Sequence, residues 1–306
     1  MKLSRLAPAK VNLYLHVAAP DHRGYHPLRS LVVFADYGDE VHVDYWRRKG
    51  RFTIDGPYAE GLSTGEDNLV LKALRLFEAE TGEKITADLR LTKNLPLASG
   101  IGGGSADAGA LLRLLKAQRP EMKKAQLQAI AAHTGADGVM CLWSQACIAE
   151  GYGEKVSPVI VPDLPCVLIN PGVECPTPAV FRAYDEVSHY KPLHSRWFGE
   201  DILPPEMLVD DNFFGSVGLP DIPLHEVWDY LNTTRNDLEV PAIRLVPVIG
   251  EVLASLRAQP ETRFARMSGS GATCFALCET LSEAETLAAR LRADWPKAWV
   301  RACTLK

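Results

Sequence analysis

The sequence predicts an α+β protein of two domains. Strand-like and helix-like periodicities alternate through the first half of the chain, prolines concentrate at residues 158–165, and a new series of strands and helices follows. The chain has 306 residues, of which 47% are hydrophobic and 23% charged, so it can bury a sizeable core without metals or disulfides. We therefore expect one domain over residues 1–160 and a second over residues 161–306.

The first predicted elements are a hairpin, a helix and a strand. Apolar and polar residues alternate over residues 41–45, and Gly50 then turns the chain into a second alternating stretch, residues 52–54. Asp67 or Asn68 can cap a helix whose apolar stripe runs from Val70 to Phe77, and Gly82 is placed to end it. Alternation over residues 87–91 then predicts a strand with one buried face.

A glycine-rich loop leads from that strand into the next helix. The loop runs from Lys93 to Ser105, after which helical spacing resumes and continues until Pro120 stops it. A further helix has Leu127 and Ile130 on one face and precedes the Gly135 turn.

The second predicted domain begins with an apolar strand over residues 166–169. Residues 187–223 show no clean period and are dense in Pro, Gly and Asp, so we expect a long irregular excursion there. Strands near Phe264 and over residues 273–278 flank a turn at residues 268–271. A helix starting at a Ser282–Glu285 capping box and a last strand near Trp299 complete the pattern.

Charge and composition exclude several classes of protein. The 38 acidic and 33 basic residues are interspersed, and the cluster at residues 47–51 is interpreted as a solvated hairpin tip, so nucleic acid is not the expected partner. No apolar run approaches the length of a membrane span, and basic residues interrupt the N-terminus. The seven cysteines form no CxxC pair and are expected to be buried thiols in a reducing compartment, with a zinc site as the alternative. We therefore expect a cytoplasmic protein.

The strongest chemical signal is the segment Gly100–Ala106. Consecutive glycines between a strand and a helix allow the backbone to approach a ligand, and the exposed N–H groups at a helix start favour phosphate. The segment is not a Walker A loop, because no Gly-Lys-Ser/Thr follows, and it is a poor dinucleotide fingerprint. A plain flexible loop is the alternative.

Three weaker signals accompany this loop. Lys10 and Asn12 interrupt an apolar strand, and a lysine in that position either pairs with a carboxylate or serves an anion. The segment Ser268–Thr273 is a glycine-rich turn between strands. Asp137 is a candidate general base or metal ligand, with a turn aspartate as the alternative.

Taken together, the segments APAKVNLYLHV, PLASGIGGGSADAG and MSGSGATCFAL resemble the three ordered motifs of the GHMP kinases, a superfamily of small-molecule kinases. Further segments, including Gly24-Tyr25-His26, Gly135-Ala136-Asp137 and Asn236-Asp237-Leu238, resemble the branch that uses ATP and Mg²⁺ to phosphorylate the 2-hydroxyl of a diphosphocytidyl-methylerythritol. The resemblance covers nearly the whole chain. It implies a two-domain GHMP kinase fold, with a ribosomal-protein-like N-terminal ATP-binding domain, a ferredoxin-like C-terminal domain and an active site in the cleft between them.

The resemblance also implies roles for individual residues. Asp137 would take the proton of the substrate hydroxyl, and Lys10 beside it would keep the carboxylate ionised and offset phosphoryl charge. Asn68 and Lys93 would be further nucleotide contacts, and Ser105 a contact of the magnesium ion. The triphosphate would be wrapped by Pro96, Leu97, Ala98, Ser99, Gly100, Ile101, Gly102, Gly103, Gly104, Ser105 and Ala106.

On the acceptor side, Tyr25 and Phe181 match the aromatic residues that hold the cytosine, and His26 matches the residue that recognises the base edge. Asn12 would line the methylerythritol pocket, and Thr177 lies in the same matched context as Phe181. The expected partners are therefore ATP and a cytidine diphosphate-linked substrate, without nucleic acid or membrane, in a monomer or weak homodimer.

The chain departs from the family pattern at several places. Arg23 stands where the family commonly has Asp, and Pro27 follows His26. Asp107 replaces a common Asn and brings a carboxylate close to the expected phosphate site. Gly138 and Val139 replace Val-Pro after Asp137, exchanging a rigid proline for a glycine that we interpret as flexible.

Two alternatives remain open at this stage. One is a GHMP kinase that acts on another small alcohol. The other is a catalytically silent nucleotide-binding or RNA-binding protein, because one fold serves several functions.

Overall fold

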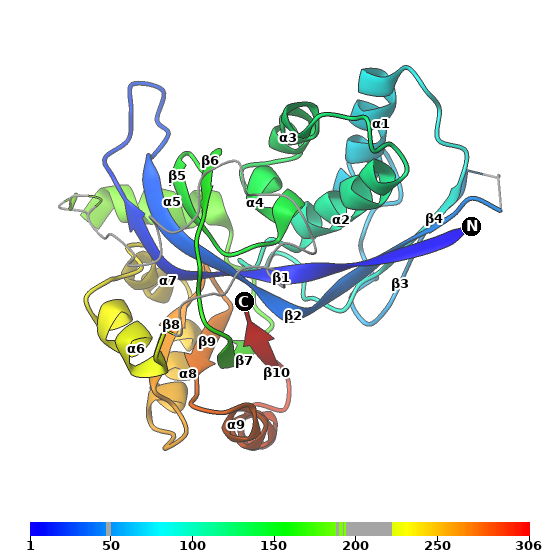
Figure 1. The fold of residues 1–306 in the computed structure, drawn as a ribbon. Helices are drawn as coiled ribbons and strands as arrows, with labels where there is room; N and C mark the ends of the chain where they lie inside the picture. The colour runs from blue at the N-terminus through cyan, green and yellow to red at the C-terminus, as the bar shows by residue number, and fades with distance from the viewer. Residues whose placement is uncertain (47–49, 188–189, 192, 194–221) are drawn as a thin grey trace. The chain divides into compact units, whose positions relative to one another are not determined.

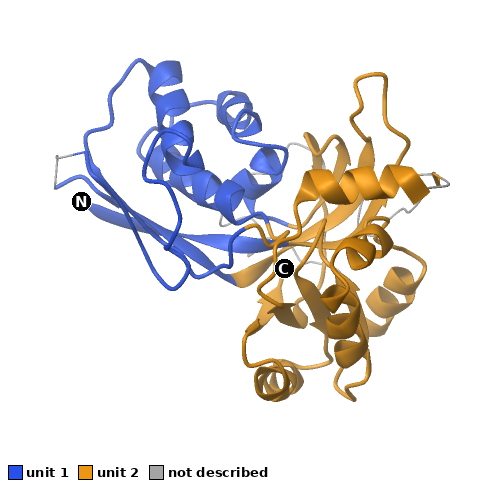
Figure 2. Ribbon diagram, turned by 180° about the vertical axis from the view of Figure 1, so that it is seen from behind, with its two compact units in different colours: residues 1–10, 37–97, 102–145 blue, residues 11–36, 98–101, 146–306 orange. Residues whose placement is uncertain are grey.

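The computed structural model describes residues 1–46, 50–187, 190, 191, 193 and 222–306. The chain divides into two compact units, each assembled from three stretches of sequence (Figure 2). Unit 1 consists of residues 1–10, 37–97 and 102–145, and unit 2 of residues 11–36, 98–101 and 146–306. The long strands β1 (Lys2–Val17) and β2 (Leu28–Asp44) therefore contribute residues to both units (Figure 1). The domain limits predicted from the sequence, residues 1–160 and 161–306, stay a prediction.

The sheet of unit 1 corrects the predicted hairpin. Strand β4 (Asp88–Thr92) lies between β2, with which it is antiparallel, and β3 (Phe52–Asp55), with which it is parallel. Residues 41–44 and 52–54 do form strands as predicted, whereas Tyr45 lies in a turn, and the two stretches do not pair with each other. Alternation identifies the buried face of a strand without specifying its neighbour, which explains the wrong pairing. The predicted tip at Arg47, Arg48 and Lys49 lies outside the described residues.

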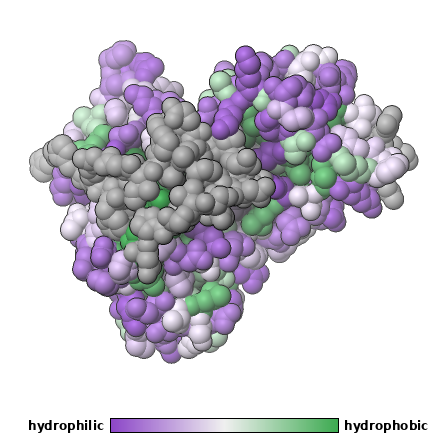
Figure 3. All heavy atoms as spheres, in the orientation of Figure 1, coloured by the Kyte–Doolittle hydropathy of each residue, from purple (hydrophilic) through white to green (hydrophobic). Residues whose placement is uncertain are grey.

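Three predicted helices of unit 1 are confirmed, and a short fourth helix follows that the sequence did not predict. The four are α1 (Leu69–Thr81), α2 (Gly103–Ala117), α3 (Lys124–Ala132) and the short α4 (Gly138–Trp143). Asn68 caps α1, and Gly82 ends it in the left-handed conformation that favours glycine, with φ 70°. Helix α2 packs against both α1 and α4 and buries most of its side chains. The described surface around α1 and α3 is mostly hydrophilic in Figure 3, as expected for helices with a single apolar face.

The sheet of unit 2 has the ferredoxin-like order that the resemblance implied. Strands β7 (Leu164–Asn170), β8 (Phe264–Met267), β9 (Cys274–Leu277) and β10 (Trp299–Leu305) form an antiparallel sheet in the order β10-β7-β9-β8. Helices α5 (Thr177–Val187), α6 (Leu224–Asn232), α7 (Glu239–Leu245) and α8 (Val248–Arg257) lie between β7 and β8 in sequence, and α9 (Leu281–Asp294) lies between β9 and β10. This arrangement is a βαββαβ unit. A hairpin of β5 (Cys147–Gly151) and β6 (Lys155–Pro158) pairs with residues 28–32 of β2.

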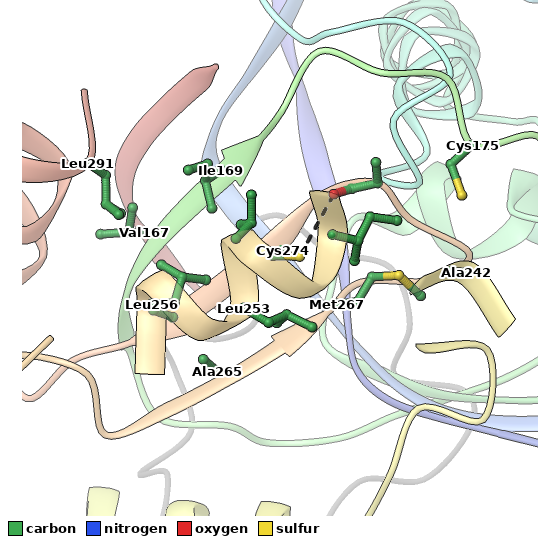
Figure 4. Close-up of a cluster of buried hydrophobic side chains, with 14 of the residues drawn as sticks. Val167, Ile169, Cys175, Ala242, Leu253, Leu256, Ala265, Met267, Cys274 and Leu291 are labelled. Atoms are coloured by element: carbon green, nitrogen blue, oxygen red, sulfur yellow. Dashed lines mark hydrogen bonds between the residues drawn. The ribbon is translucent and has the colours of Figure 1, made fainter. Parts of the chain in front are cut away.

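The core of unit 2 lies between this sheet and its helices (Figure 4). Val167 and Ile169 from β7 pack in one cluster with Leu253 and Leu256 of α8 and Leu291 of α9, and all five side chains are fully buried or nearly so. Truncating one of these leucines to alanine typically costs about 2–5 kcal/mol, because the cavity left behind does not close completely.

The start of α9 corrects a second sequence prediction. The helix begins at Leu281, and Thr280 is the N-cap, whose hydroxyl accepts a hydrogen bond from the Glu283 N–H at 3.1 Å. Glu283 in turn accepts from the Glu279 N–H at 2.9 Å. Thr280–Glu283 and Ser282–Glu285 have the same spacing, so the sequence pattern alone selected the wrong pair.

Three further observations concern the chain as a whole. All seven cysteines are free and buried, as predicted. Most of the predicted irregular excursion, residues 188–189, 192 and 194–221, lies outside the described residues. Of the helices that the structure describes, none is both long enough and apolar enough to span a membrane.

Candidate active site

Unit 1 brings Lys10 and Asp137 together. The Lys10 Nζ lies 3.2 Å from Asp137 Oδ2, and the lysine side chain is 6% exposed whereas the aspartate is 33% exposed. Asp137 is the N-cap residue of α4, yet its side chain makes no capping hydrogen bond. The structure thus shows a carboxylate partner for Lys10, and that carboxylate is partly exposed.

The backbone on both sides of Asp137 is tightly packed. A Cβ on Gly138 would overlap the Ala131 carbonyl oxygen and would lie 2.8 Å from Thr134 Oγ1, a contact that real Cβ atoms do not show. The interpretation of Gly138 as a flexible residue is therefore wrong. Glycine is required there because α3 and α4 approach each other closely, and this approach holds Asp137 in place.

The predicted phosphate loop leads into an open helix N-terminus. Gly102, in a left-handed conformation with φ 66°, is the N-cap of α2, and as a glycine it has no side chain to cap the helix. The N–H groups of the first turn are consequently available to an anion. A Cβ on Gly102 would lie 3.3 Å from Lys10 Cβ and 3.5 Å from Asp137 Oδ2, so the ion pair lies directly against this helix start.

Lys93 lies behind the same helix start. Its ammonium group is buried and forms ion pairs with Asp39 and, at 2.8 Å, with Asp107. Burial opposes the charge on Lys93, but the two carboxylates outweigh it and raise the pKa of the lysine. A Cβ on Gly103 would lie 3.3 Å from Lys93 Nζ, which places the ammonium immediately beneath the first residue of α2. The Lys93 side chain is thus fully engaged with protein groups.

The carboxylate of Asp107, which replaces the common asparagine, is accommodated by its ion pair with Lys93. Asp107 lies within α2, where its Oδ2 accepts from Lys93 while its buried Oδ1 accepts no hydrogen bond from any described residue. Burial and the nearby Asp39 raise the pKa of Asp107 well above its ordinary value, and Lys93 only partly opposes this shift.

Two other predicted residues of unit 1 lie near the helix start. Asn68 caps α1 through its Oδ1, which accepts from the Val70 N–H at 2.9 Å, and its amide donates to the Ser63 carbonyl. The residue after Asn68 reaches Gly104, since a Cβ there would lie 3.3 Å from Leu69 Cδ1. Ser105 is half-buried in the first turn of α2, on the side facing Gly135.

Unit 2 brings the middle of the glycine-rich loop against the late glycine turn. The Ser99 carbonyl accepts hydrogen bonds from the N–H and the hydroxyl of Thr273. A Cβ on Gly100 would overlap the Gly271 carbonyl oxygen. Two motifs that are far apart in the sequence therefore touch through their main chains. Among the other predicted loop residues, Pro96 and Ile101 are buried, whereas Leu97 and Ala98 are exposed.

Asn12 lies beside the late glycine turn. Its N–H donates to Ser268 Oγ at 3.1 Å, and its side-chain amide donates to Ser30 Oγ at 2.7 Å. The Asn12 Oδ1 is buried and accepts no hydrogen bond from a described residue, so an acceptor is left for a ligand. Thr177 reaches the same turn, where its hydroxyl lies 2.7 Å from Ser270 Oγ.

The predicted cytosine-binding residues form two groups in unit 2. The rings of His26 and Phe181 lie 5.2 Å apart between centroids, and the His26 nitrogens contact the Ala18 carbonyl at 2.9 Å and Asp185 Oδ1 at 3.3 Å. Tyr25 is 62% exposed, and its ring neighbour is Tyr152, 6.1 Å away. Among the described residues no ring contact joins Tyr25 to Phe181.

Sequence reasoning missed the residues that support these groups. Asp39 had no assigned role in the sequence, yet in the structure it pairs with Lys93 and accepts hydrogen bonds from the N–H groups of Asn94 and Leu95. Asp185, one turn after Phe181, and Tyr152 carried no chemical signal in the sequence. No three His, Cys, Asp or Glu side chains gather as metal ligands anywhere in the described part of the chain.

Comparison with known proteins places this site in a family. The model named "GHMP kinases N terminal domain" matches residues 68–145, and "GHMP kinases C terminal" matches residues 224–297. A 4-diphosphocytidyl-2-C-methyl-D-erythritol kinase of Caulobacter vibrioides (strain NA1000 / CB15N) is 46% identical, over 100% of both chains. The chain belongs to the 4-diphosphocytidyl-2-C-methyl-D-erythritol kinase family. Another protein of that family, from Hyphomonas neptunium, is 43% identical over 99% of this chain and 96% of its own.

Solved structures agree with this membership. A crystal structure of a 4-(cytidine 5'-diphospho)-2C-methyl-D-erythritol kinase aligns with a TM-score of 0.71 and 33% identity, covering 99% of both chains. A homoserine kinase from Cytophaga hutchinsonii aligns with a TM-score of 0.69 over 99% of this chain and 95% of its own, but at 20% identity it shows the fold alone. The predicted GHMP kinase fold and the class of ATP-dependent small-molecule kinase are thereby confirmed.

Proposed function

We propose that this chain transfers the γ-phosphoryl group of ATP to the 2-hydroxyl of 4-diphosphocytidyl-2-C-methyl-D-erythritol, a step of the non-mevalonate route to isoprenoid precursors. One observation carries the proposal. The Lys10–Asp137 ion pair lies against Gly102, at a helix N-terminus that no side chain caps. A base, a cation and an anion-binding helix start are thus combined in one place, and phosphoryl transfer depends mainly on such positioning and charge neutralisation.

Asp137 is proposed as the base that accepts the hydroxyl proton of the acceptor. Its carboxylate is partly exposed and makes no capping hydrogen bond to α4, so a substrate hydroxyl can reach it. Lys10 orients the Asp137 carboxylate through their ion pair and adds positive charge beside the phosphoryl group in transfer. Because Lys10 is buried, its ammonium keeps one orientation and does not need to be ordered during the reaction.

The first turn of α2 is proposed to bind the phosphates of ATP through its main-chain N–H groups. Residues 96–106 supply this loop, with Asn68 at its side and Lys93 behind it. The geometry of Lys93 favours an indirect role, in which its charge and its ion pairs hold Gly103 and the loop in position. A direct contact with nucleotide would require a rearrangement of those ion pairs.

The residues present also fit a magnesium ion bound to the triphosphate. Mg²⁺ usually takes one or two protein oxygen ligands together with phosphates and water. In unit 1, the half-buried hydroxyl of Ser105, in the first turn of α2, is a suitable ligand. When bound, the ion would supply positive charge that offsets the charge of the phosphates.

The acceptor is proposed to bind to unit 2. The unpartnered, buried Oδ1 of Asn12 suits a hydroxyl group of the methylerythritol part, because a hydroxyl can donate the hydrogen bond that this oxygen lacks. Thr177, joined to Ser270, lies at the edge of the same glycine turn. A ligand without that hydroxyl would leave the Asn12 oxygen buried and unsatisfied, which disfavours its binding.

The cytosine is proposed to contact Tyr25, His26 and Phe181. An exposed tyrosine ring offers apolar area to a flat base. Both ring nitrogens of His26 are already engaged with Ala18 and Asp185, so the imidazole can read the base edge only in exchange for one of these contacts. Asp185 therefore belongs to the proposed base site.

The remaining parts of the proposal concern partners and location. We expect a monomer or weak homodimer without a nucleic-acid or membrane partner, since acidic and basic residues are interspersed along the chain. Seven buried free thiols suit the reducing cytoplasm.

The test is ADP release from ATP and Mg²⁺ in the presence of diphosphocytidyl-methylerythritol. We expect release that depends on this acceptor and falls by about a hundredfold or more in Asp137→Ala, as for the loss of a general base. Asp163→Ala is the matched control, because Asp163 is exposed and, among the residues that the structure describes, its ion-pair partner is Lys306, 3.6 Å away.

Each failure has its own meaning. Unchanged turnover in Asp137→Ala would refute the assigned base. Activity that cytidine 5'-diphosphate does not inhibit would refute the cytosine site and indicate a GHMP kinase for another alcohol.

A further inference from the structure

A short turn in unit 2 is organised around Asp21. Its Oδ1 accepts hydrogen bonds from the main-chain N–H groups of Arg23, at 2.9 Å, and Tyr25, at 3.0 Å. Its Oδ2 accepts from Arg23 Nε at 2.9 Å and from the Tyr152 hydroxyl at 2.8 Å. Asp21 is only 17% exposed, and both of its carboxylate oxygens are fully used. The turn therefore fixes the backbone of Tyr25 and the side chain of Arg23 together.

The charge of Asp21 is maintained by these partners. Its limited burial opposes ionisation, but the hydrogen bonds from Tyr25, Tyr152 and Arg23 outweigh it and hold the pKa of Asp21 well below its usual range. These hydrogen bonds favour the ionised form, in which the carboxylate accepts from all four donors.

Arg23 covers two aromatic rings. Its Cζ lies 5.7 Å from the centroid of the Tyr25 ring and 5.2 Å from that of Tyr152. These are cation–π distances. The two tyrosine rings meet edge to face, 6.1 Å apart and inclined by 71°. Tyr25 is thus bounded on one side by a guanidinium and at its edge by a second ring, although it is 62% exposed overall.

An exposed side chain held in this way is unusual. A tyrosine with so much exposed surface normally exchanges among rotamers, and a ligand that stacks on it must bear the entropic cost of ordering it. The contacts with Arg23 and Tyr152 reduce that cost before any ligand arrives. Because the guanidinium covers part of the ring, the exposed part is the area left for a flat ligand.

We propose that Arg23, anchored by Asp21 and Tyr152, is a positioning residue that holds the Tyr25 ring ready for a pyrimidine base. The inference rests on the proposed function, in which Tyr25 contacts the cytosine. It adds a determinant at a position where the family resemblance leads us to expect aspartate. An aspartate at that position cannot stack on either ring.

The test is a double-mutant cycle of Arg23→Gln and Tyr25→Leu, read from kcat/KM for diphosphocytidyl-methylerythritol. Glutamine keeps length and polarity but removes the charge and the stacking plane. We expect Arg23→Gln to lower kcat/KM about fivefold through KM of the acceptor, with KM for ATP and kcat within about twofold of the parent. In the Tyr25→Leu background the same change should cost less than about twofold, because the ring it positions is gone.

Two further variants separate positioning from a general effect of charge. Arg23→Lys retains the charge and should restore part of the lost kcat/KM. Arg263→Gln removes another exposed arginine of unit 2, paired with Glu279 and Glu283, and should leave kcat/KM unchanged. Thermal unfolding of every variant checks that the fold is retained.

Three results would count against this reasoning in distinguishable ways. An unchanged KM in Arg23→Gln would overturn the role of Arg23. An equal loss in the Tyr25→Leu background would mean that Arg23 acts independently of Tyr25, which also overturns it. If cytidine 5'-diphosphate fails to inhibit the parent protein, the proposed cytosine site fails first and the inference fails with it.

Discussion

The close approach at Gly138 leads to a quantitative prediction for Gly138→Ala. The added Cβ would overlap the Ala131 carbonyl oxygen, and 3.0 Å is the shortest distance that real Cβ atoms keep from such neighbours. To reach it, α4 has to move relative to α3 by about 1 Å, a displacement of the size that costs roughly a hundredfold in catalysis when it misplaces a reacting group. Asp137 immediately precedes Gly138 and would move with it.

We therefore expect kcat of Gly138→Ala to fall about a hundredfold, while KM for ATP changes little. Overpacking of this kind also destabilises a protein by about 1–3 kcal/mol. Steady-state ADP release and urea unfolding measure the two effects separately.

Gly250→Ala in α8 is the matched control. A Cβ there would lie 3.2 Å from Ile243 Cγ2, so a shift of a few tenths of an ångström suffices, and a helix residue with better propensity is gained. We expect the control to keep full activity and stability. A Gly138→Ala protein with kcat within threefold of the parent would show that Asp137 does not depend on this packing.

Two further predictions concern pH. Burial and Asp39 raise the pKa of Asp107, so the folded state favours the protonated carboxyl. This stabilisation is lost as the pH rises from the pKa of Asp107 in the unfolded chain through its pKa in the folded protein. In urea unfolding, Asp107→Asn should therefore be more stable than the parent at pH 8, but not at pH 3. For His16, burial and the charges of Arg235, Arg266 and Arg29 lower the pKa from 6.5 to about 3, so stability that is present above pH 6.5 is lost as the pH falls toward 3. His16→Asn should flatten this dependence of stability on pH. A parent protein that is equally stable at pH 7 and pH 4 would contradict the argument.

Local signals in the sequence were sufficient for most elements of the fold. Asn68 and Gly82 limit α1 as predicted, because a capping side chain and a left-handed glycine act within a few residues. The predicted pairing of β3 with β2 was wrong because β4 lies between them in the sheet, although β4 comes more than thirty residues after β3 in the chain. Pairing of that kind depends on tertiary packing, which periodicity does not report.

The candidate site, like the fold, could be predicted from the sequence only in part. The residue types of Lys10 and Asp137 indicated their chemistry, and the structure brings them within 3.2 Å of each other. The sequence could not show that Gly138 is required by a close helix approach, because the partner is a backbone oxygen, which every residue has. It also gave no sign that Asp185 would engage His26, since the two are 159 positions apart and aspartate is common on exposed helix surfaces.

The interleaving of the two units has a consequence for biosynthesis. Strand β10, at residues 299–305, pairs with β7 and reaches β2, and residue 306 exchanges main-chain hydrogen bonds with Phe34. Unit 1, by contrast, contains no residue beyond 145. During vectorial synthesis the first unit can therefore close early, while residues 11–36 must wait for nearly the whole chain to emerge before their last partners arrive. Until then their apolar strand surfaces remain available to chaperones and to neighbouring nascent chains.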